Sequence, residues 1–532
     1  MNNRRRMPFI AMTGLAGLLA LSGAFVIPEI AAAGTPDAVP ASRPATSSAA
    51  ADAYQNGISH NGYSPDTTIV PPLANRWSHT FAGPVSYPVI ADGKVFATVA
   101  DNGGGNGSNL YALDQASGAI VWSQPLGASY PWSNAAYDAG RVFAVNYNGQ
   151  MQAFDAATGT LDWITQMPGQ YAFSSPPTAA SGIVYTGGAG SGGTVYAVSE
   201  SNGTVLWTQP VQNGDNSSPA LSGSGVFVSY ACGLVYAFDP VTGKQQWFSN
   251  GPCEGGGGKT PVYNAGLVYT RDFNGNKVLN ASTGALEGTF SSTPAPAFAG
   301  NIGLFLNGST LTARENGQTL WSFAGDGKLD TAPIAVQGTV YEGSSSGMLY
   351  GLNAASGNVT WSTNVGSAIP APDEQNVSQP LTGLGAGQGL LVVPAGDQLS
   401  AYSSASTVGQ VTGYGNLALD DFRSGLSNGT PVDLYSPNGS GAQQWSYYQG
   451  QLINSVNGLC LDDNAWGGSG TKQDMWQCTG GANEHWTHTA NGEYVNKANG
   501  LCLNDPGYST AKGTQQILWK CVGTANEAYS LP

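Results

Sequence analysis

Short apolar runs alternate with polar turns along most of the chain, and one such unit recurs about every 40 residues. In the copy LYALDQASGAIVW, an apolar strand ends at Asp114, a turn follows at Gly118, and Trp122 lies four residues later. The turn glycines of the copies are Gly118, Gly159, Gly203, Gly243, Gly284, Gly317 and Gly357, and each except Gly284 is followed four residues later by tryptophan. Short strands with this period predict four-stranded sheets arranged radially around an axis.

The repeat has a physical reason, because a single small sheet has two apolar faces and cannot bury them alone. We therefore expect the tryptophans to pack between neighbouring sheets, and the glycines to supply the positive φ of tight turns. The sequence around Trp77 has the end of the repeat without its start, whereas LLVVPAGDQLSAYSS has the start without its tryptophan. The N-terminal strand is expected to complete the last sheet and close the ring. The repeats predict eight sheets, or seven if the short step before Gly317 is not a full repeat.

Composition narrows the class of protein. The chain has 532 residues, 75 glycines, 10% charged residues and a formal net charge of -15. This acidic balance argues against nucleic acid as a partner, since phosphates require basic patches. Turn residues between short apolar runs indicate an all-β chain. We expect a monomer.

The order of segments is predicted as follows. Residues 1–33 have a basic head, an uncharged apolar run and small residues at the end, which predicts a cleaved signal peptide. An uncleaved membrane anchor is the alternative, and after cleavage no membrane association is expected. Residues 34–70 are predicted as a disordered linker and lead-in, residues 71–406 as the radial repeat domain, and residues 410–532 as a second domain.

The phrase ALD-x-x-x-G-x-x-x-W resembles the repeat of the pyrroloquinoline-quinone-type β-propellers. That repeat is shared by quinoprotein dehydrogenases and by non-enzymatic outer-membrane assembly lipoproteins. The dehydrogenases hold the quinone and a Ca²⁺ in the central channel, often beside adjacent cysteines. This chain has no adjacent cysteine pair, and its acidic residues follow no ligand spacing. Catalytic residues therefore remain unassigned and no metal or cofactor is predicted; pyrroloquinoline quinone with calcium is expected only if the chain is a quinoprotein.

A second repeat begins after Gly409. The segments GNLALDD, GLCLDD and GLCLND are equally spaced, and each unit closes with QQW, EHW or EAY. Three such units resemble the ricin B-chain lectin β-trefoil, which is also the fold of family 13 carbohydrate-binding modules. The closing aromatics Trp445, Trp486 and Tyr529 are expected in the core of this domain.

The lectin resemblance implies sugar-binding residues in each unit: an acid of the opening strand, an aromatic residue of the middle strand, and polar groups before the closing aromatic. A pyranose would stack its C–H face on the aromatic ring while the polar groups bind its hydroxyls. The middle unit offers Asp462, Trp476 and Asn483, with Asp474 where glutamine is usual. The first unit offers Asp420, Asp433, Tyr435 and Gln443, with Ala442 in place of the expected amide. The last unit offers Asn504, Trp519 and Asn526. We expect the middle unit to bind best.

The same resemblance implies disulfides between Cys460 and Cys478 and between Cys502 and Cys521. Cys232 and Cys253 remain, and they could pair across a hairpin of the propeller. Three pairs fit an oxidising, extracellular compartment.

Three functions remain open. The first is a secreted carbohydrate-binding protein whose propeller is an interaction scaffold, with glycans or polysaccharides as partners, and the absence of channel chemistry favours it. The second is a quinoprotein oxidoreductase anchored to a polysaccharide. The third is a glycan-active hydrolase or lyase with its site in the propeller. Activity after addition of quinone and Ca²⁺ would distinguish the second, and release of products from polysaccharides the third.

Overall fold

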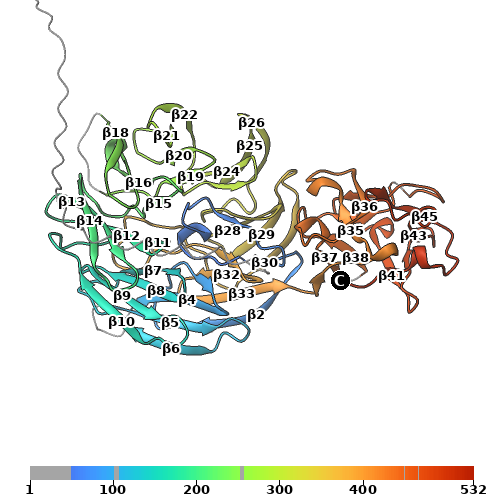
Figure 1. Cartoon of the computed structure of the whole chain (residues 1–532), viewed down its shortest axis with the longest axis horizontal. Helices are drawn as coiled ribbons and strands as arrows, with labels where there is room; N and C mark the ends of the chain where they lie inside the picture. The colour runs from blue at the N-terminus through green and yellow to red at the C-terminus, as the bar shows by residue number, and fades with distance from the viewer. Residues whose placement is uncertain (1–48, 101–106, 252–256, 449, 465) are drawn as a thin grey trace, which may run out of the picture. The chain divides into compact units, whose positions relative to one another are not determined.

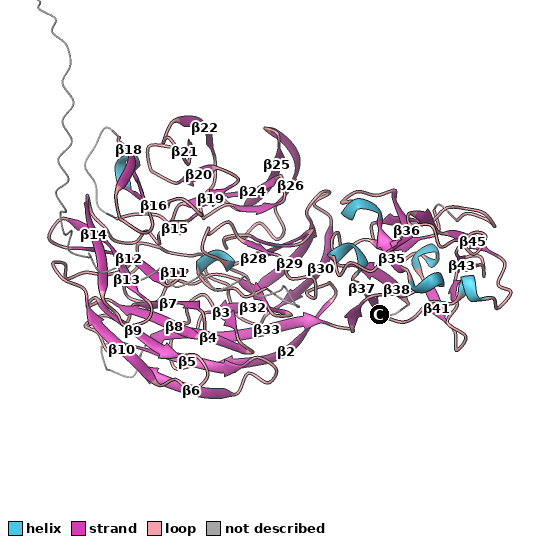
Figure 2. Cartoon of the chain, viewed as in Figure 1, coloured by secondary structure: helices cyan, strands magenta, loops and turns pink. Residues whose placement is uncertain are grey.

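The computed structural model describes residues 49–100, 107–251, 257–448, 450–464 and 466–532. These residues are almost entirely strands and turns, with only short single-turn helices between them (Figure 2). The predicted all-β class is therefore correct. Among the described residues, no helix is long and apolar enough to cross a bilayer.

Eight antiparallel sheets of four strands follow one another through the described residues of the first domain (Figure 1). We number them sheets 1 to 8 in the order of their first strands, and each corresponds to one copy of the sequence repeat. Sheet 1 contains β3 (Val89–Ala91), β4 (Lys94–Ala100), β5 (Ser108–Asp114) and β6 (Ile120–Pro125), and sheet 2 contains β7 (Ser133–Asp138), β8 (Arg141–Asn146), β9 (Gln150–Asp155) and β10 (Leu161–Gln166). Sheet 3 contains β11 (Thr178–Ala180), β12 (Ile183–Ala189), β13 (Gly193–Ser199) and β14 (Val205–Val211), and sheet 4 contains β15 (Ala220–Leu221), β16 (Val226–Tyr230), β17 (Leu234–Phe238) and β18 (Gln245–Ser249).

Sheet 5 contains β19 (Val262–Asn264), β20 (Leu267–Thr270), β21 (Asn276–Asn280) and β22 (Leu286–Phe290), and sheet 6 contains β23 (Ala297–Ala299), β24 (Ile302–Asn307), β25 (Thr310–Glu315) and β26 (Gln318–Phe323). Sheet 7 contains β27 (Ile334–Val336), β28 (Thr339–Gly343), β29 (Met348–Asn353) and β30 (Val359–Asn364), and sheet 8 contains β31 (Gly385–Gly387), β32 (Leu390–Ala395), β33 (Gln398–Ser404) and β2 (Leu73–Thr80). The short strand β1 (Tyr63–Ser64) adds to sheet 7 in parallel with β27, and single-turn helices lie at η1 (Tyr54–Asn56) and η2 (Ala231–Gly233).

Sheet 8 is closed by the N-terminal strand, as predicted. β2 pairs antiparallel with β33, and Trp77 of β2 lies opposite Ala401. Strands more than 300 residues apart in the sequence therefore share one sheet. This pairing covers the edge that β33 would otherwise expose.

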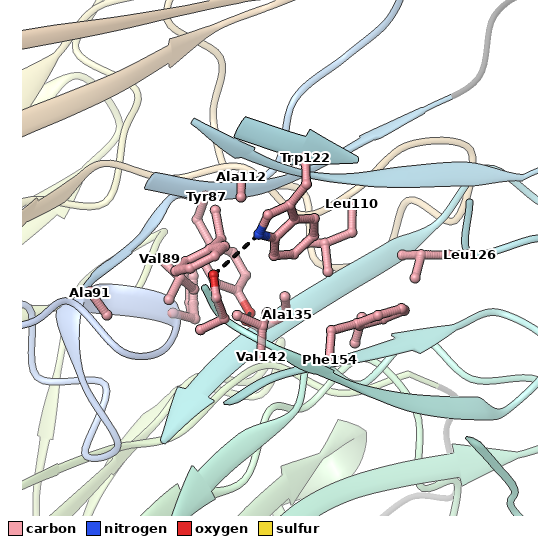
Figure 3. Close-up of a cluster of buried hydrophobic side chains, with 14 of the residues drawn as sticks. Tyr87, Val89, Ala91, Leu110, Ala112, Trp122, Leu126, Ala135, Val142 and Phe154 are labelled. Carbon is pink, nitrogen blue, oxygen red and sulfur yellow. Dashed lines mark hydrogen bonds between the residues drawn. The ribbon is translucent and has the colours of Figure 1, made fainter. Parts of the chain in front are cut away.

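Tryptophans of the repeat join neighbouring sheets at seven of the eight junctions. In each case the indole Nε1–H donates to a backbone carbonyl of the following sheet, at distances from 2.8 to 3.2 Å. The pairs are Trp77 with Gln115, Trp122 with Ala156, Trp163 with Glu200, Trp207 with Pro240, Trp247 with Ala281, Trp321 with Ala354, and Trp361 with Leu73. Figure 3 shows the Trp122 ring among apolar side chains of sheets 1 and 2, with its hydrogen bond dashed.

The junction between sheets 5 and 6 lacks this tryptophan, because Gly288 occupies its position. Aromatic rings fill the space instead: Tyr269 packs on Phe298 with 4.8 Å between ring centroids, and Phe290 packs on Phe305 at 5.6 Å. At the turn glycine that follows, Gly317, no described residue lies within 4 Å of the position of an added Cβ. Only the positive φ of this turn therefore favours glycine at position 317.

A matched pair of variants separates the two roles of the turn glycine. Gly159 has φ +72°, and an added Cβ would lie 2.6 Å from the Trp122 ring, whereas Gly317 has a similar φ of +78° and open space. Gly159→Ala is expected to lower the free energy of unfolding by about 2–4 kcal/mol, from backbone strain and overpacking together. Gly317→Ala is expected to lower it by only about 1 kcal/mol. Urea unfolding of both variants measures the difference, and equal losses would contradict the packing role.

Residues 51–64, which we call the central segment, are ordered, whereas residues 34–70 were predicted as a disordered linker and lead-in. Residues 34–48 of that range lie outside the described residues. Ala51, Tyr54, Gln55 and His60 are buried, so the described fold begins about twenty residues before the predicted start at Pro71. The segment has no apolar periodicity, because it is held mainly by backbone groups rather than by one apolar face.

The central segment contacts the first strand of every sheet. Backbone or side-chain hydrogen bonds link it to Ile90, Tyr137, Thr178, Leu221, Tyr263, Phe298, Ala335 and Ala386, one residue in each of the eight sheets. These first strands are the buried inner edges, whereas the fourth strands are largely exposed. Unpaired polar groups at buried edges are unfavourable, so the segment satisfies part of each edge at the centre of the ring.

The second domain has three pseudo-equivalent units, as the sequence predicts. Its strands are β34 (Val408–Gly409), β35 (Ala418–Asp421), β36 (Thr430–Tyr435), β37 (Trp445–Tyr448), β38 (Gln451–Asn454), β39 (Cys460–Asp462), β40 (Asp474–Trp476), β41 (Trp486–His488), β42 (Tyr494–Asn496), β43 (Cys502–Asn504), β44 (Thr514–Gln515) and β45 (Ile517–Trp519). Single-turn helices lie at η3 (Tyr414–Asn416), η4 (Phe422–Ser424), η5 (Gly441–Gln443), η6 (Ala482–Glu484) and η7 (Ala525–Glu527).

The closing aromatics form the core of this domain. Trp445, Trp486 and Tyr529 are buried in one cluster with leucines of all three units. The indoles of Trp445 and Trp486 donate to the carbonyls of Leu419 and Leu461, at 2.8 and 3.0 Å. Their predicted structural role is confirmed.

Two of the predicted disulfides are present in the second domain. Cys460 is bonded to Cys478 and Cys502 to Cys521, each inside one unit. Cys232 is also disulfide-bonded, and Cys253, its predicted partner, lies outside the described residues. In the chain-entropy account, a crosslink that closes a loop of this size stabilises the fold by about 3 kcal/mol.

Candidate carbohydrate-binding site

Each unit of the trefoil presents the same antiparallel strand pair. Asp420 lies opposite Asp433 in the first unit, Asp462 opposite Asp474 in the middle unit, and Asn504 opposite Ile517 in the last unit. Residues directly opposite in an antiparallel pair extend to the same face of the sheet. The first two units therefore place two carboxyl groups side by side, and the last unit places none.

The middle-strand aromatics lie beside these pairs and are exposed. Tyr435, Trp476 and Trp519 lie opposite Ala418, Cys460 and Cys502, and between 42% and 46% of each aromatic residue is accessible. Large aromatic side chains are usually buried, so a repeated exposed ring beside polar groups is a feature that a ligand would explain. The disulfides anchor the strands that carry Trp476 and Trp519, because Cys478 and Cys521 follow each ring by two residues.

A short helix after each strand pair brings in the predicted amide. Asn483 of η6 donates through Nδ2 to Oδ2 of Asp462, and Asn526 of η7 donates to Oδ1 of Asn504 at 3.3 Å. The structure thus brings together the predicted acid or amide of the opening strand and the predicted asparagine in the middle and last units.

The first unit makes the same contact with a different residue. Gln443 of η5 donates through Nε2 to Oδ2 of Asp420 at 2.8 Å, and its Oε1 accepts from the backbone N–H of Asn438. In the other units the glutamates at the position of Gln443, Glu484 and Glu527, accept backbone N–H groups of the preceding loop. The Gln443 side chain is longer than that of asparagine, so it can accept from the loop and donate to Asp420 at the same time. Asp420 therefore has an amide partner although residue 442 is alanine.

The middle unit encloses a hollow of about 320 Å³, which we call the middle hollow. It is lined by Asp462, Asn464, Trp466, Trp476 and Asn483. Trp466 was not predicted, and it is the more exposed of the two tryptophans, at 62%. Its backbone N–H donates to Oδ1 of Asp463 at 2.8 Å, and its φ of +65° turns the loop at this point. The signal for Trp466 in the sequence is an aromatic at the same distance from the opening strand in the last unit, Tyr508.

The first unit has a larger hollow of about 490 Å³, the first hollow, whose lining includes Asp420, Asp433 and Tyr435. Two basic residues, Arg423 and Lys512, also line it. The Lys512 ammonium lies 5.9 Å from the centre of the Tyr435 ring. None of the described residues that line the middle hollow is basic, so the two hollows differ in charge.

One carboxyl group in each of the two pairs has a raised pKa. Burial, reinforced by Asp462 and Asp463, raises the pKa of Asp474 to about 7. Burial and Asp420 raise the pKa of Asp433 to about 7. Near neutral pH each of these two carboxyl groups is therefore only partly ionised, so each pair can both donate and accept hydrogen bonds.

The propeller residues do not fit a calcium-bound quinone on the central axis. The central segment occupies the inner edges of all eight sheets. A hollow of about 370 Å³ near Arg271 and Lys259 exists, but the Arg271 guanidinium is committed to Glu374 in a buried ion pair of 2.8 Å. Among the described residues, one cluster has metal-ligand spacing, Glu493, Cys502 and Glu527, and Cys502 is oxidised in a disulfide.

Comparisons with known families agree with both halves of the fold. The family model described as outer membrane protein assembly factor BamB matches residues 74–229 and 191–393, and the model of the ricin-type β-trefoil lectin domain matches residues 407–528. The molecule is therefore a repeat β-propeller joined in one chain to a lectin-type β-trefoil. Because the first model spans more than half of the sequence, the chain belongs to the BamB family of pyrroloquinoline-quinone-type repeat propellers.

Individual relatives match only in part. The BamB protein of Yersinia pestis is 26% identical over 279 residues, which cover 48% of this chain and 63% of the relative. The dehydrogenase subunit of the quinone alcohol dehydrogenase of Gluconobacter oxydans (strain 621H) is 28% identical over 209 residues, covering 34% of this chain and 27% of the relative. The chain thus spans less than two thirds of these curated relatives. The quinohemoprotein alcohol dehydrogenase from Comamonas testosteroni has a TM-score of 0.53 at 14% identity, covering 66% of this chain and 80% of that chain, a likeness of fold alone.

Proposed function

We propose that this protein is a secreted carbohydrate-binding protein, with the trefoil holding glycans or polysaccharides and the propeller serving as an interaction scaffold. The ricin-type lectin domain supports carbohydrate binding. The observation that carries the proposal is the middle hollow, where an exposed Trp476 lies beside the hydrogen-bonded pair of Asp462 and Asn483. This arrangement offers a flat apolar surface for a pyranose ring and fixed polar atoms for its hydroxyls.

Secretion is part of the proposal and has separate support. Residues 1–33 have the composition of a signal peptide. The disulfides Cys460–Cys478 and Cys502–Cys521 persist best in an oxidising compartment.

A single shallow site of this kind binds weakly, with a dissociation constant of the order of 1 mM. A polysaccharide that reaches the first and middle hollows together would bind more tightly, because the second contact is made at a high effective concentration. We therefore expect long glycans to bind better than short oligosaccharides of the same composition.

The test uses the full chain on a glycan array, followed by titration calorimetry with the glycans that bind. Trp476→Ala is expected to weaken binding by a factor of about ten or more, since the stacking surface is removed. The matched control is Trp519→Ala, which removes an equally exposed tryptophan from the unit that lacks the carboxyl pair. Binding that is unaffected by Trp476→Ala, or an array on which no glycan binds, would refute the assignment.

A further inference from the structure

Arg423 gives the first hollow a positive charge that the other units lack. It lies in η4 and lines the hollow, whereas the corresponding residues of the middle and last units are Ala465 and Gly507. The backbone of Arg423 has φ +59°, and that of Gly507 has φ +70°. This left-handed conformation favours glycine. The long basic side chain of Arg423 therefore stands at a backbone position that does not itself favour a side chain.

Lys512 brings a second positive charge to the first hollow from the last unit. The next residue, Gly513, fixes this loop because its backbone N–H donates to the carbonyl of Leu434 at 2.9 Å. The equivalent loops of the other two units make the same backbone bond to the middle and last strand pairs, and they have Asn428 and Ser469 where this loop has Lys512. Both basic residues of the first hollow are thus absent from the pseudo-equivalent positions.

The two basic side chains are available to a ligand. Both residues are exposed, and neither forms an ion pair with another described residue. The Lys512 ammonium lies 5.9 Å from the centre of the Tyr435 ring, and 42% of Tyr435 is exposed. A sugar that stacks on this ring would therefore have its substituents within reach of a positive charge that no acidic side chain neutralises.

The acidic residues of the first hollow lie deeper than the basic ones. Only 7% of Asp420 and 3% of Asp433 are exposed, and Oδ2 of Asp420 already accepts from Gln443. Because burial and Asp420 raise the pKa of Asp433 to about 7, most of Asp433 is neutral at pH 6. At that pH the lining has two positive charges at its exposed rim and about one negative charge at its buried floor.

We propose that the first hollow recognises a hexuronic acid, a pyranose that carries a carboxylate, which stacks on Tyr435 while its carboxylate binds Arg423 and Lys512. A carboxylate matches the planar guanidinium of arginine through two parallel hydrogen bonds. Asp420 accepts from a hydroxyl group of the ring. This inference rests on the proposed function and names the ligand class of a second site on the same trefoil. Arg423 and Lys512 then determine the specificity of this site.

The test compares a tetrasaccharide of galacturonic acid with its methyl ester, in which every carboxylate is neutral, by titration calorimetry on the full chain. At about pH 6 the uronate is fully ionised. At about 0.1 M salt, charges more than about 10 Å away are largely screened, so the net charge of -15 on the whole chain acts only weakly at the hollow. The uronate is expected to bind about tenfold more tightly than the ester, as two exposed ion pairs allow.

Salt dependence tests the same contact without any variant. When salt is raised from about 0.1 to about 0.5 M, the affinity of the uronate should fall toward that of the ester, because the exposed charges of the rim are screened. The affinity of the ester should stay constant. This measurement remains informative if a variant fails to fold.

Three charge-removing variants locate the preference. Arg423→Gln and Lys512→Gln are each expected to reduce the ratio of the two affinities, and together to abolish it. Lys497→Gln is the matched control, since it removes one exposed positive charge from a residue of the trefoil that lines neither hollow. Tyr435→Ala should weaken binding of both tetrasaccharides, because it removes the stacking surface that they share.

The possible outcomes separate this inference from the proposed function. Equal or tighter binding of the ester would overturn the inference, as would a preference that survives the loss of both Arg423 and Lys512 or that Lys497→Gln reduces equally. If neutral glycans bind through Trp476 but the uronate is not preferred over its ester, this inference fails while the proposed function stands.

Discussion

Replacing Trp122 with alanine is expected to lower the free energy of unfolding by about 3–5 kcal/mol. Only 9% of Trp122 is exposed, and its ring lies between sheets 1 and 2 in the cluster of Figure 3. The variant loses this packing and the hydrogen bond to the carbonyl of Ala156. The space left behind cannot close easily, because both sheets are held by their neighbours in the ring. The midpoint of urea unfolding, followed on the full chain, measures the loss.

Two further variants control for the type and place of the change. Trp122→Phe keeps much of the apolar contact, and we expect it to lose less than half as much stability as Trp122→Ala. Trp519→Ala removes an exposed tryptophan, and its effect should be about 0.5 kcal/mol or less. If Trp122→Ala is no more destabilising than Trp519→Ala, the tryptophans do not hold the sheets together.

Tyr54→Ala is expected to destabilise the protein by a similar amount, about 3–5 kcal/mol, and it tests the central segment directly. Tyr54 is fully buried, and its ring packs on Tyr87 with 5.4 Å between centroids. In a disordered linker the same change would have no effect on unfolding. Calorimetric and urea unfolding of the full chain would distinguish these cases.

Tyr54→Phe provides the matched control. The Tyr54 hydroxyl is buried and has no hydrogen-bond partner among the described residues. Burial also raises the pKa of this phenol, so it remains neutral. Because phenylalanine keeps the ring and removes the unsatisfied hydroxyl, we expect stability to stay the same or rise by about 1 kcal/mol. A large loss in Tyr54→Phe would mean that the hydroxyl has a partner that stabilises it.

The sequence was informative wherever a repeat imposes spacing. The seven turn glycines and their tryptophans predicted the sheets, and the two incomplete phrases around Trp77 and Leu399 predicted the closing strand. The three trefoil units begin 42 residues apart and resemble a lectin fold, and that resemblance implied the core aromatics and the two disulfides that the structure contains. In these cases each residue type is required by packing that recurs in every unit.

Features that occur once were missed. The central segment is rich in glycine, asparagine and serine, a composition it shares with disordered linkers, and its contacts are mainly to backbone groups. Trp466 lies in the loop between β39 and β40, and the first unit has Ser424 at the corresponding position. Gln443 replaces the missing amide by the length of its side chain, which alignment of positions cannot indicate.

The central segment and the closing strand β2 together have a kinetic consequence. Both precede sheet 1 in the chain, yet their partners include β31 and β33, which belong to the last propeller sheet to be synthesised. During synthesis, the strands of seven sheets are available before the central segment and β2 can pair with the last sheet. Contacts this distant in sequence slow folding. A nascent chain that stops before Ser404 therefore has no closed ring to fold into, and it depends on protection from aggregation until its last blade emerges.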